Sequence, residues 1–194
     1  MSRPKAVGGQ HMAGAARCML IAAAALMAMA GLARAQLLSL PPGGPIALIG
    51  DEPSYLDLGL GSYSAFDHDG KFRTVDGRAE FRFGQKLFYF GPAAGIVANG
   101  YGGVDGFAGI YTDIRLGPFR LTPLTSISLY HHGDSHDKNL SGLIEFRSEV
   151  TLSYELPGGM RIGLVAAHMS NANIYRRNPG ENDFMASLAF PLGF

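Results

Sequence analysis

The sequence predicts an all-β protein, an eight-stranded antiparallel outer-membrane β-barrel that follows a cleaved signal peptide. Three observations support this prediction: an apolar N-terminal run with basic flanks, eight segments of alternating polarity, and connections between them that alternate in length. Only 16% of the 194 residues are charged, against roughly 25% in soluble domains. The formal net charge is zero, so there is no electrostatic reason to expect a nucleic-acid partner.

The first 35 residues have the composition of a secretory signal peptide. They contain four basic residues and no acidic residue, and the apolar run at 18–32 is 15 residues long. Such a run is too short for a membrane span, which needs about 20 residues, and it ends in the A-x-A cleavage site at 33–35. We therefore expect cleavage near Ala35, because no stop-transfer flank follows that would favour an N-terminal anchor.

Removal of this segment changes both the net charge and the cysteine count. The mature part, 36–194, keeps 12 of the 16 basic residues against 16 acidic residues, a net charge of −4, and it loses Cys18, the only cysteine. An exported chain without disulfides must be stabilised by packing or by a membrane. Because no apolar run after residue 35 is long enough for a spanning helix, a membrane form has to be a barrel.

Residues 36–53 carry Pro and Gly clusters and are expected to form a leader into the barrel, which we place at 54–194. Period-two alternation predicts eight strands, at 54–66, 72–84, 87–99, 104–116, 119–131, 141–155, 160–172 and 183–194. Eight is the smallest even number that closes an outer-membrane barrel, and alternating long and short connections are typical of such barrels. The terminal Phe194 resembles the aromatic residue on which outer-membrane barrels end.

Charged residues within the predicted strands share one face of each strand. The clearest cases are Glu80, Arg82, Glu145, Arg147 and Glu149. An eight-stranded barrel is filled by side chains rather than open, so charges of mixed sign at i±2 spacing are expected to pair inside it. We assign these residues a structural role, although the alternation alone does not separate a membrane barrel from a soluble one.

The seventh predicted strand breaks the pattern, because His168 and Ser170 continue an apolar row that begins at Ile162. This row should face lipid, where polar groups are costly unless they lie near the interface or have a task. With both termini periplasmic, the strand runs outward and carries the two residues to its extracellular end. Their Cβ atoms should lie about 6 to 7 Å apart, close enough for the imidazole to take the hydroxyl proton. The pair predicts an activated serine nucleophile that can reach a lipid.

The motif HMSN at 168–171, followed by NPG at 178–180 and a short last strand that ends on an aromatic residue, resembles the lipid A 3-O-deacylases of the PagL type. The resemblance is specific over 142–194 and extends only to the fold before that segment. It implies an outer-membrane esterase that hydrolyses the ester-linked 3-hydroxyacyl chain at position 3 of lipid A. Lipopolysaccharide in the outer leaflet is then the partner, no metal or other cofactor is needed, and a homodimer is allowed.

The resemblance also implies roles for individual residues. Ser170 is the nucleophile, His168 the general base, Asn178 helps to form the oxyanion hole, and Asn171 contributes to the same site. The triad acid of the family is a Glu two residues past the loop glycine, a position that is Asn182 here.

Glu181 precedes that position, so Asn182 matches the triad acid by geometry and Glu181 matches it by chemistry. A one-residue shift in the loop would turn Glu181 outward, and we take Glu181 as the expected acid with Asn182 in a supporting role. An amide can orient an imidazole, but it stabilises the imidazolium less than a carboxylate does. An Asn in this role would therefore predict reduced or absent activity.

Two other classes of protein fit parts of the sequence. A non-enzymatic small barrel with a role in adhesion or membrane integrity would use its extracellular loops as binding surfaces. A soluble periplasmic β-barrel would hold a lipid inside. His132 and His136 lie in a predicted extracellular loop and His131 ends the predicted strand before it, and the spacing of the three matches no zinc or calcium signature.

Overall fold

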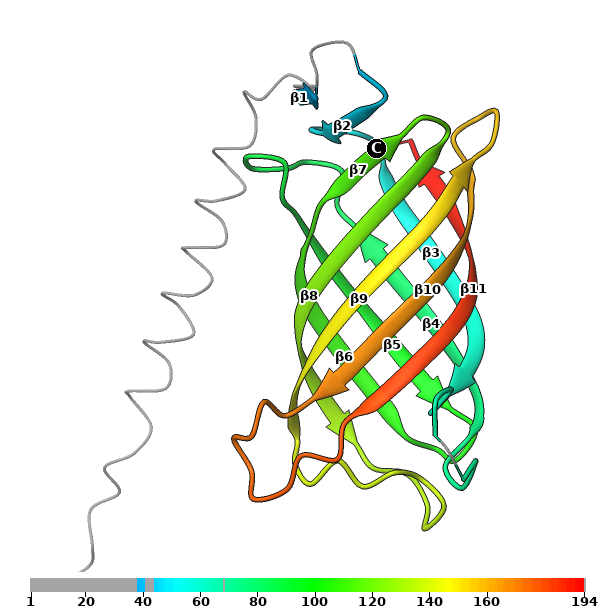
Figure 1. The fold of residues 1–194 in the computed structure, drawn as a ribbon, viewed down its shortest axis with the longest axis vertical. Coiled ribbons are helices and arrows are strands. Elements are labelled where there is room, and N and C mark those ends of the chain that lie inside the picture. The colour runs from blue at the N-terminus through cyan, green and yellow to red at the C-terminus, as the bar shows by residue number, and fades with distance from the viewer. Residues whose placement is uncertain (1–37, 41–43, 68, 194) are drawn as a thin grey trace, which may run out of the picture. The chain divides into compact units, whose positions relative to one another are not determined.

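The chain folds into a closed antiparallel β-barrel in the computed structural model, which describes residues 38–40, 44–67 and 69–193 (Figure 1). The predicted signal peptide and Phe194 lie outside the described residues. No helix in the described part of the chain is long and apolar enough to cross a membrane.

Eight strands form the wall of the barrel. They are β3 (Ser54–Tyr63), β4 (Thr74–Arg82), β5 (Gly91–Asn99), β6 (Val104–Tyr111) with its continuation β7 (Asp113–Leu116), β8 (Phe119–His131), β9 (Ile144–Glu155), β10 (Arg161–Ser170) and β11 (Glu181–Leu192). Each strand pairs with its neighbours along the chain, and β11 also pairs with β3, so the sheet closes on itself. The predicted fold class, an eight-stranded antiparallel barrel, is confirmed.

The observed strands differ from the predicted ones mainly at their ends. The third predicted strand starts at Gly91 rather than Leu87, because Leu87 and Phe90 close a tight turn. Phe88 and Tyr89 within that turn have φ angles of 49° and 72°, which a strand cannot accommodate. The fourth predicted strand is interrupted at Thr112, and both of its parts pair with β8.

Part of the predicted leader also joins the sheet. Strand β1 (Leu38–Leu40) pairs with β2 (Ile46–Ile49), and β2 pairs with β7. Just after β2, the Glu52 carboxylate lies 2.8 Å from Lys86 Nζ and 2.6 Å from Arg161 Nη2. We call this end, at the top of Figure 1, the turn end, and the opposite end, with connections 132–143 and 171–180, the loop end.

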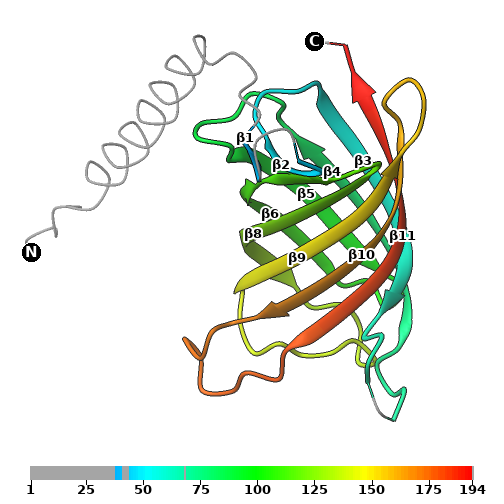
Figure 2. The same cartoon turned by 45° about the horizontal axis from the view of Figure 1, so that its top comes forward.

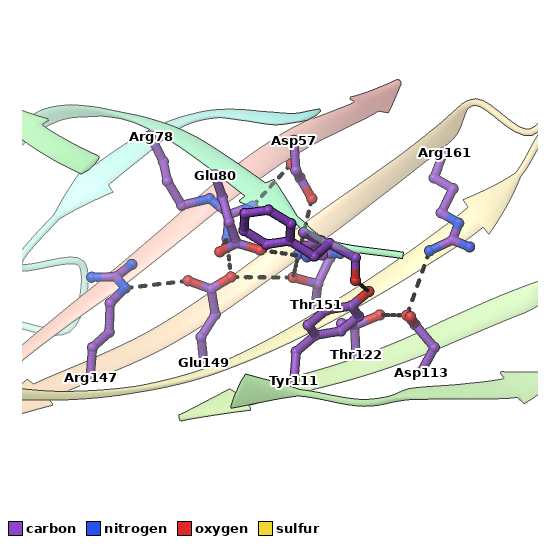
Figure 3. A network of polar contacts seen from close by, with 12 residues as sticks. Asp57, Arg78, Glu80, Tyr111, Asp113, Thr122, Arg147, Glu149, Thr151 and Arg161 are labelled. Carbon is purple, nitrogen blue, oxygen red and sulfur yellow. Dashed lines mark hydrogen bonds and ion pairs between the residues drawn. The ribbon is translucent and has the colours of Figure 1, made fainter. Parts of the chain in front are cut away.

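Charged side chains fill the interior of the barrel and pair there (Figure 3). The Arg78 guanidinium lies 2.9 Å from Asp57 and also contacts Glu80 and Glu149. Near the loop end, Arg147 Nη1 lies 2.7 Å from Asp183. Glu80, Arg82, Arg147 and Glu149 are paired as predicted, which supports their structural role. The prediction fails for Glu145, which is buried without an ion pair or hydrogen bond among the described residues.

The outer wall of the barrel is apolar, whereas its interior is polar. Large exposed hydrophobic side chains cover it on every strand, for example Leu60, Ile96, Ile127, Leu164 and Phe184. An interior hollow next to Tyr63 and Arg147 has a volume of only about 10 Å³. This arrangement, an apolar wall around an interior filled with charged side chains, is that of a membrane barrel.

Candidate active site

The site lies on the outer wall at the loop end, where β9, β10 and β11 run side by side (Figure 2). Side chains of β10 alternate strictly between buried and exposed from Arg161 to Met169, and His168 belongs to the exposed set. In the sheet register, His168 lies opposite Asn182 on β11 and opposite Ser148 on β9. The lipid-facing position predicted for His168 is therefore observed.

The His168 imidazole is oriented by a hydrogen bond to its cross-strand neighbour. Its Nδ1 donates to Asn182 Oδ1 over 2.9 Å. Because a carboxamide oxygen only accepts, this bond keeps the proton on Nδ1 and leaves the Nε2 lone pair free. An imidazole in this state can act as a general base at Nε2, and its partner holds it in the required tautomer.

Glu181 does not take this position, and the expectation that a loop shift would turn it outward is wrong. Its side chain is fully buried inside the barrel, where a carboxylate oxygen accepts a hydrogen bond from the Ser64 backbone N–H over 2.6 Å. Strand β11 already starts at Glu181, in register with Met169, which also points inward. With strand pairing established at 181, alternation directs Asn182 outward.

Ser170 is the last residue of β10 and is half-buried, on the same face as His168. Gly180 flanks the imidazole at the end of the following loop. A Cβ atom on Gly180 would lie 3.2 Å from His168 Cε1 and 3.8 Å from Nε2, and the residue has a φ of 62°. The absence of a side chain at 180 therefore keeps the Nε2 edge of the ring uncovered.

Asn171 holds the loop that follows Ser170. Its side chain is fully buried, with Nδ2 donating to the carbonyls of Leu140 (3.0 Å) and Arg177 (2.8 Å) and Oδ1 accepting from Asn173 N (3.0 Å). With these bonds made, the Asn171 amide is committed to backbone groups of two loops. It supports the site rather than contributing a free oxyanion donor.

Asn178 is exposed in the same loop, and its side chain is held by the backbone N–H of Asn171. Its Oδ1 accepts a hydrogen bond from Asn171 N over 3.1 Å. No described residue accepts from its Nδ2, which is therefore available to a ligand. This is the state that an oxyanion donor needs before substrate binds.

Two further contacts hold the loop in place, and neither was predicted. The Tyr175 ring packs against Gly142, where a Cβ atom would overlap it, and its hydroxyl accepts a hydrogen bond from Ile144 N over 3.1 Å. Gly142 and Tyr175 come from the two connections at the loop end, 132–143 and 171–180, and Ile144 is the first residue of β9. Neither contact follows from spacing along the chain.

The barrel has a filled interior and an apolar outer wall, and this wall carries a His–Asn pair and a serine. These features define a small β-barrel protein of the outer membrane. Residues 105–191 match the family model of lipid A 3-O-deacylase (PagL). The match includes β10, the loop that follows it and β11 up to residue 191, and it confirms the resemblance predicted from the sequence. It begins at residue 105, so the resemblance extends farther toward the N-terminus than the predicted start at 142.

Solved structures establish the fold. The chain is similar to one described as the crystal structure of the outer membrane enzyme PagL, with 13% identity, a TM-score of 0.56, and coverage of 71% of this chain and 99% of that chain. It is also similar to a de novo designed transmembrane β-barrel, with 10% identity, a TM-score of 0.50, and coverage of 73% and 97%. No curated protein sequence matches this chain.

Proposed function

We propose that this protein is an outer-membrane esterase that removes the 3-O-linked acyl chain of lipid A, with Ser170 as the nucleophile and His168 as the general base. The observation that carries the proposal is the 2.9 Å bond from His168 Nδ1 to Asn182. It prepares the imidazole for proton transfer on a wall that faces lipid, within the segment that matches the deacylase family.

The reaction needs only groups that this wall provides. The Ser170 hydroxyl gives its proton to His168 Nε2 while its oxygen attacks the carbonyl carbon of the ester. Asn178 Nδ2 donates to the carbonyl oxygen as it becomes negatively charged. The imidazolium then gives the proton to the departing sugar oxygen, the C–O bond breaks, and the acyl chain stays on Ser170 until water, activated by His168, releases it as a fatty acid.

Asn182 affects the rate of both proton transfers. It holds the imidazole in the required tautomer, but it is neutral and stabilises the imidazolium less than a carboxylate does. We therefore expect turnover to be slower than a carboxylate at position 182 would give. Glu181 takes no part, because its carboxylate lies on the other side of the barrel wall.

Mass spectrometry of lipid A from cells that express the protein tests the proposal. We expect loss of the 3-O-linked acyl chain, and no loss with S170A or H168N at equal amounts of folded barrel, as judged by heat-modifiable gel mobility. An unchanged lipid A profile with folded wild-type protein would contradict the proposal and favour a non-enzymatic barrel. The homodimer stays a prediction, because neither the family match nor the fold bears on it.

A further inference from the structure

The first residues of β11 carry Asn182, and they therefore set the position of the His168 imidazole. On one side β11 pairs with β10, where Asn182 lies opposite His168. On the other side the register with β3 begins only at Phe184, opposite Ser62 (Figure 1). Among the described residues, 181–183 thus have no strand partner on the β3 side, and contacts of another kind hold Asn182 there.

Two bonds from the turn that follows β3 take the place of strand pairing. The Ala65 N–H donates to the Asn182 carbonyl over 2.9 Å. The Ser64 N–H donates to the Glu181 carboxyl group over 2.6 Å. The donors are consecutive residues and so are the acceptors, so the 64–65 turn holds Asn182 and the residue before it as a unit.

The conformation of the 64–65 turn depends on Glu181. Ser64 has a φ of 53°, which is uncommon for a residue other than glycine and persists only where surrounding contacts hold it. Ser64 and Glu181 are 2% and 0% exposed, so water does not replace the carboxyl group as the acceptor. A buried N–H without an acceptor is costly. Loss of the Glu181 acceptor should therefore release the turn, and with it the bond from Ala65 to Asn182.

The Glu181 carboxyl group has a second neighbour inside the barrel. It lies within hydrogen-bond reach of the Asp183 carboxyl group, which accepts from Arg147 Nη1 over 2.7 Å. A hydrogen bond between two carboxyl groups needs a proton on one of them. A Gln at position 181 can satisfy both neighbours, because its carbonyl oxygen accepts from Ser64 and its NH2 group donates to Asp183.

We propose that Glu181 is a positioning residue that acts on His168 through Asn182. Glu181 holds the 64–65 turn, the turn holds Asn182, and Asn182 keeps the imidazole proton on Nδ1. Glu181 contacts neither the imidazole nor a substrate, and it enters neither proton transfer. This inference rests on the proposed function, because it takes His168 as the general base.

A matched pair of variants separates the acceptor at position 181 from its charge. E181L removes the acceptor, whereas E181Q keeps it without a charge. The assay is hydrolysis of p-nitrophenyl decanoate by the full barrel in detergent micelles. We expect E181L to lower kcat about 10- to 100-fold, the effect of a small misplacement in an active site, with KM unchanged. E181Q should keep the wild-type kcat.

The imidazole reports the same change without a reaction. Nitrogen-15 chemical shifts of His168 in the labelled barrel, assigned by comparison with H168N, distinguish a proton on Nδ1 from a proton on Nε2. We expect the Nδ1–H form in the wild type and E181Q, and a mixture of both forms in E181L. E145L is the matched control, because Glu145 is also buried but has no ion pair or hydrogen bond among the described residues. It should change neither kcat nor the shifts.

Wild-type kcat and an unmixed Nδ1–H signal in folded E181L would overturn the positioning role. Loss of hydrolysis in folded E181Q would also overturn it, because the charge rather than the acceptor would then be required. If E181L does not fold, E181M takes its place, since it keeps the unbranched shape of Glu. Wild-type protein that hydrolyses no ester would overturn the proposed function, whereas the shifts would still show whether Glu181 positions the imidazole.

Discussion

Replacing Asn182 by Glu tests whether the neutral partner of His168 limits the reaction. The amide oxygen lies 2.9 Å from His168 Nδ1, so a carboxylate here would face the imidazolium that forms during catalysis. Two unit charges about 4 Å apart attract by about 1 kcal/mol in water and about 4 kcal/mol near a protein surface. Each 1.36 kcal/mol changes a rate tenfold, so N182E should raise kcat by about 5- to 1000-fold.

The assay is ester hydrolysis by purified barrel at saturating substrate, with N182Q as the uncharged control of equal length. N182Q lacks the charge and should give no increase, which separates the electrostatic effect from the longer side chain. If N182E and N182Q have the same kcat, charge at position 182 does not act on the reaction. The reasoning that links Asn182 to the imidazolium would then be refuted.

Two further predictions concern the packing of the site and of the interior. G180A should lower kcat/KM by about tenfold or more, because its methyl group would lie 3.2 Å from His168 Cε1 at a φ that disfavours a side chain; unchanged hydrolysis would show that the ring edge is not used. R147M should leave the Asp183 carboxylate buried without its 2.7 Å partner, a loss of about 3 to 5 kcal/mol. It should lower the temperature at which the folded band disappears in heat-modifiable gel electrophoresis, and an unchanged temperature would contradict the role of this ion pair.

The alternation of side chains along the strands was enough to predict the barrel and the outward position of His168. Period-two patterning is strong here because one face of each strand meets lipid and the other meets charged partners. It also directed Asn182 outward, next to Phe184. The prediction that Glu181 is the triad acid relied on the chemistry of a carboxylate rather than on this alternation. Strand pairing from residue 181 onward keeps the alternation, so Glu181 points inward and Asn182 points outward.

Other features of the site could not be predicted because they join distant parts of the chain. The contact between Asn171 and the Leu140 carbonyl spans two connections at the loop end, and no pattern in either segment indicates it. The same holds for Glu52, which comes from the predicted leader and pairs with Lys86.

The ion pairs that fill the barrel determine how a substrate can arrive. Arg78, Arg147 and their partners occupy the interior, and His168 faces away from it on the outer wall, so a substrate reaches the site from the surrounding bilayer. For the proposed reaction, the quantity that governs encounter is then the number of substrate molecules per unit area of the outer leaflet. Diluting the substrate with inert lipid should slow turnover, whereas adding more vesicles of the same composition should not.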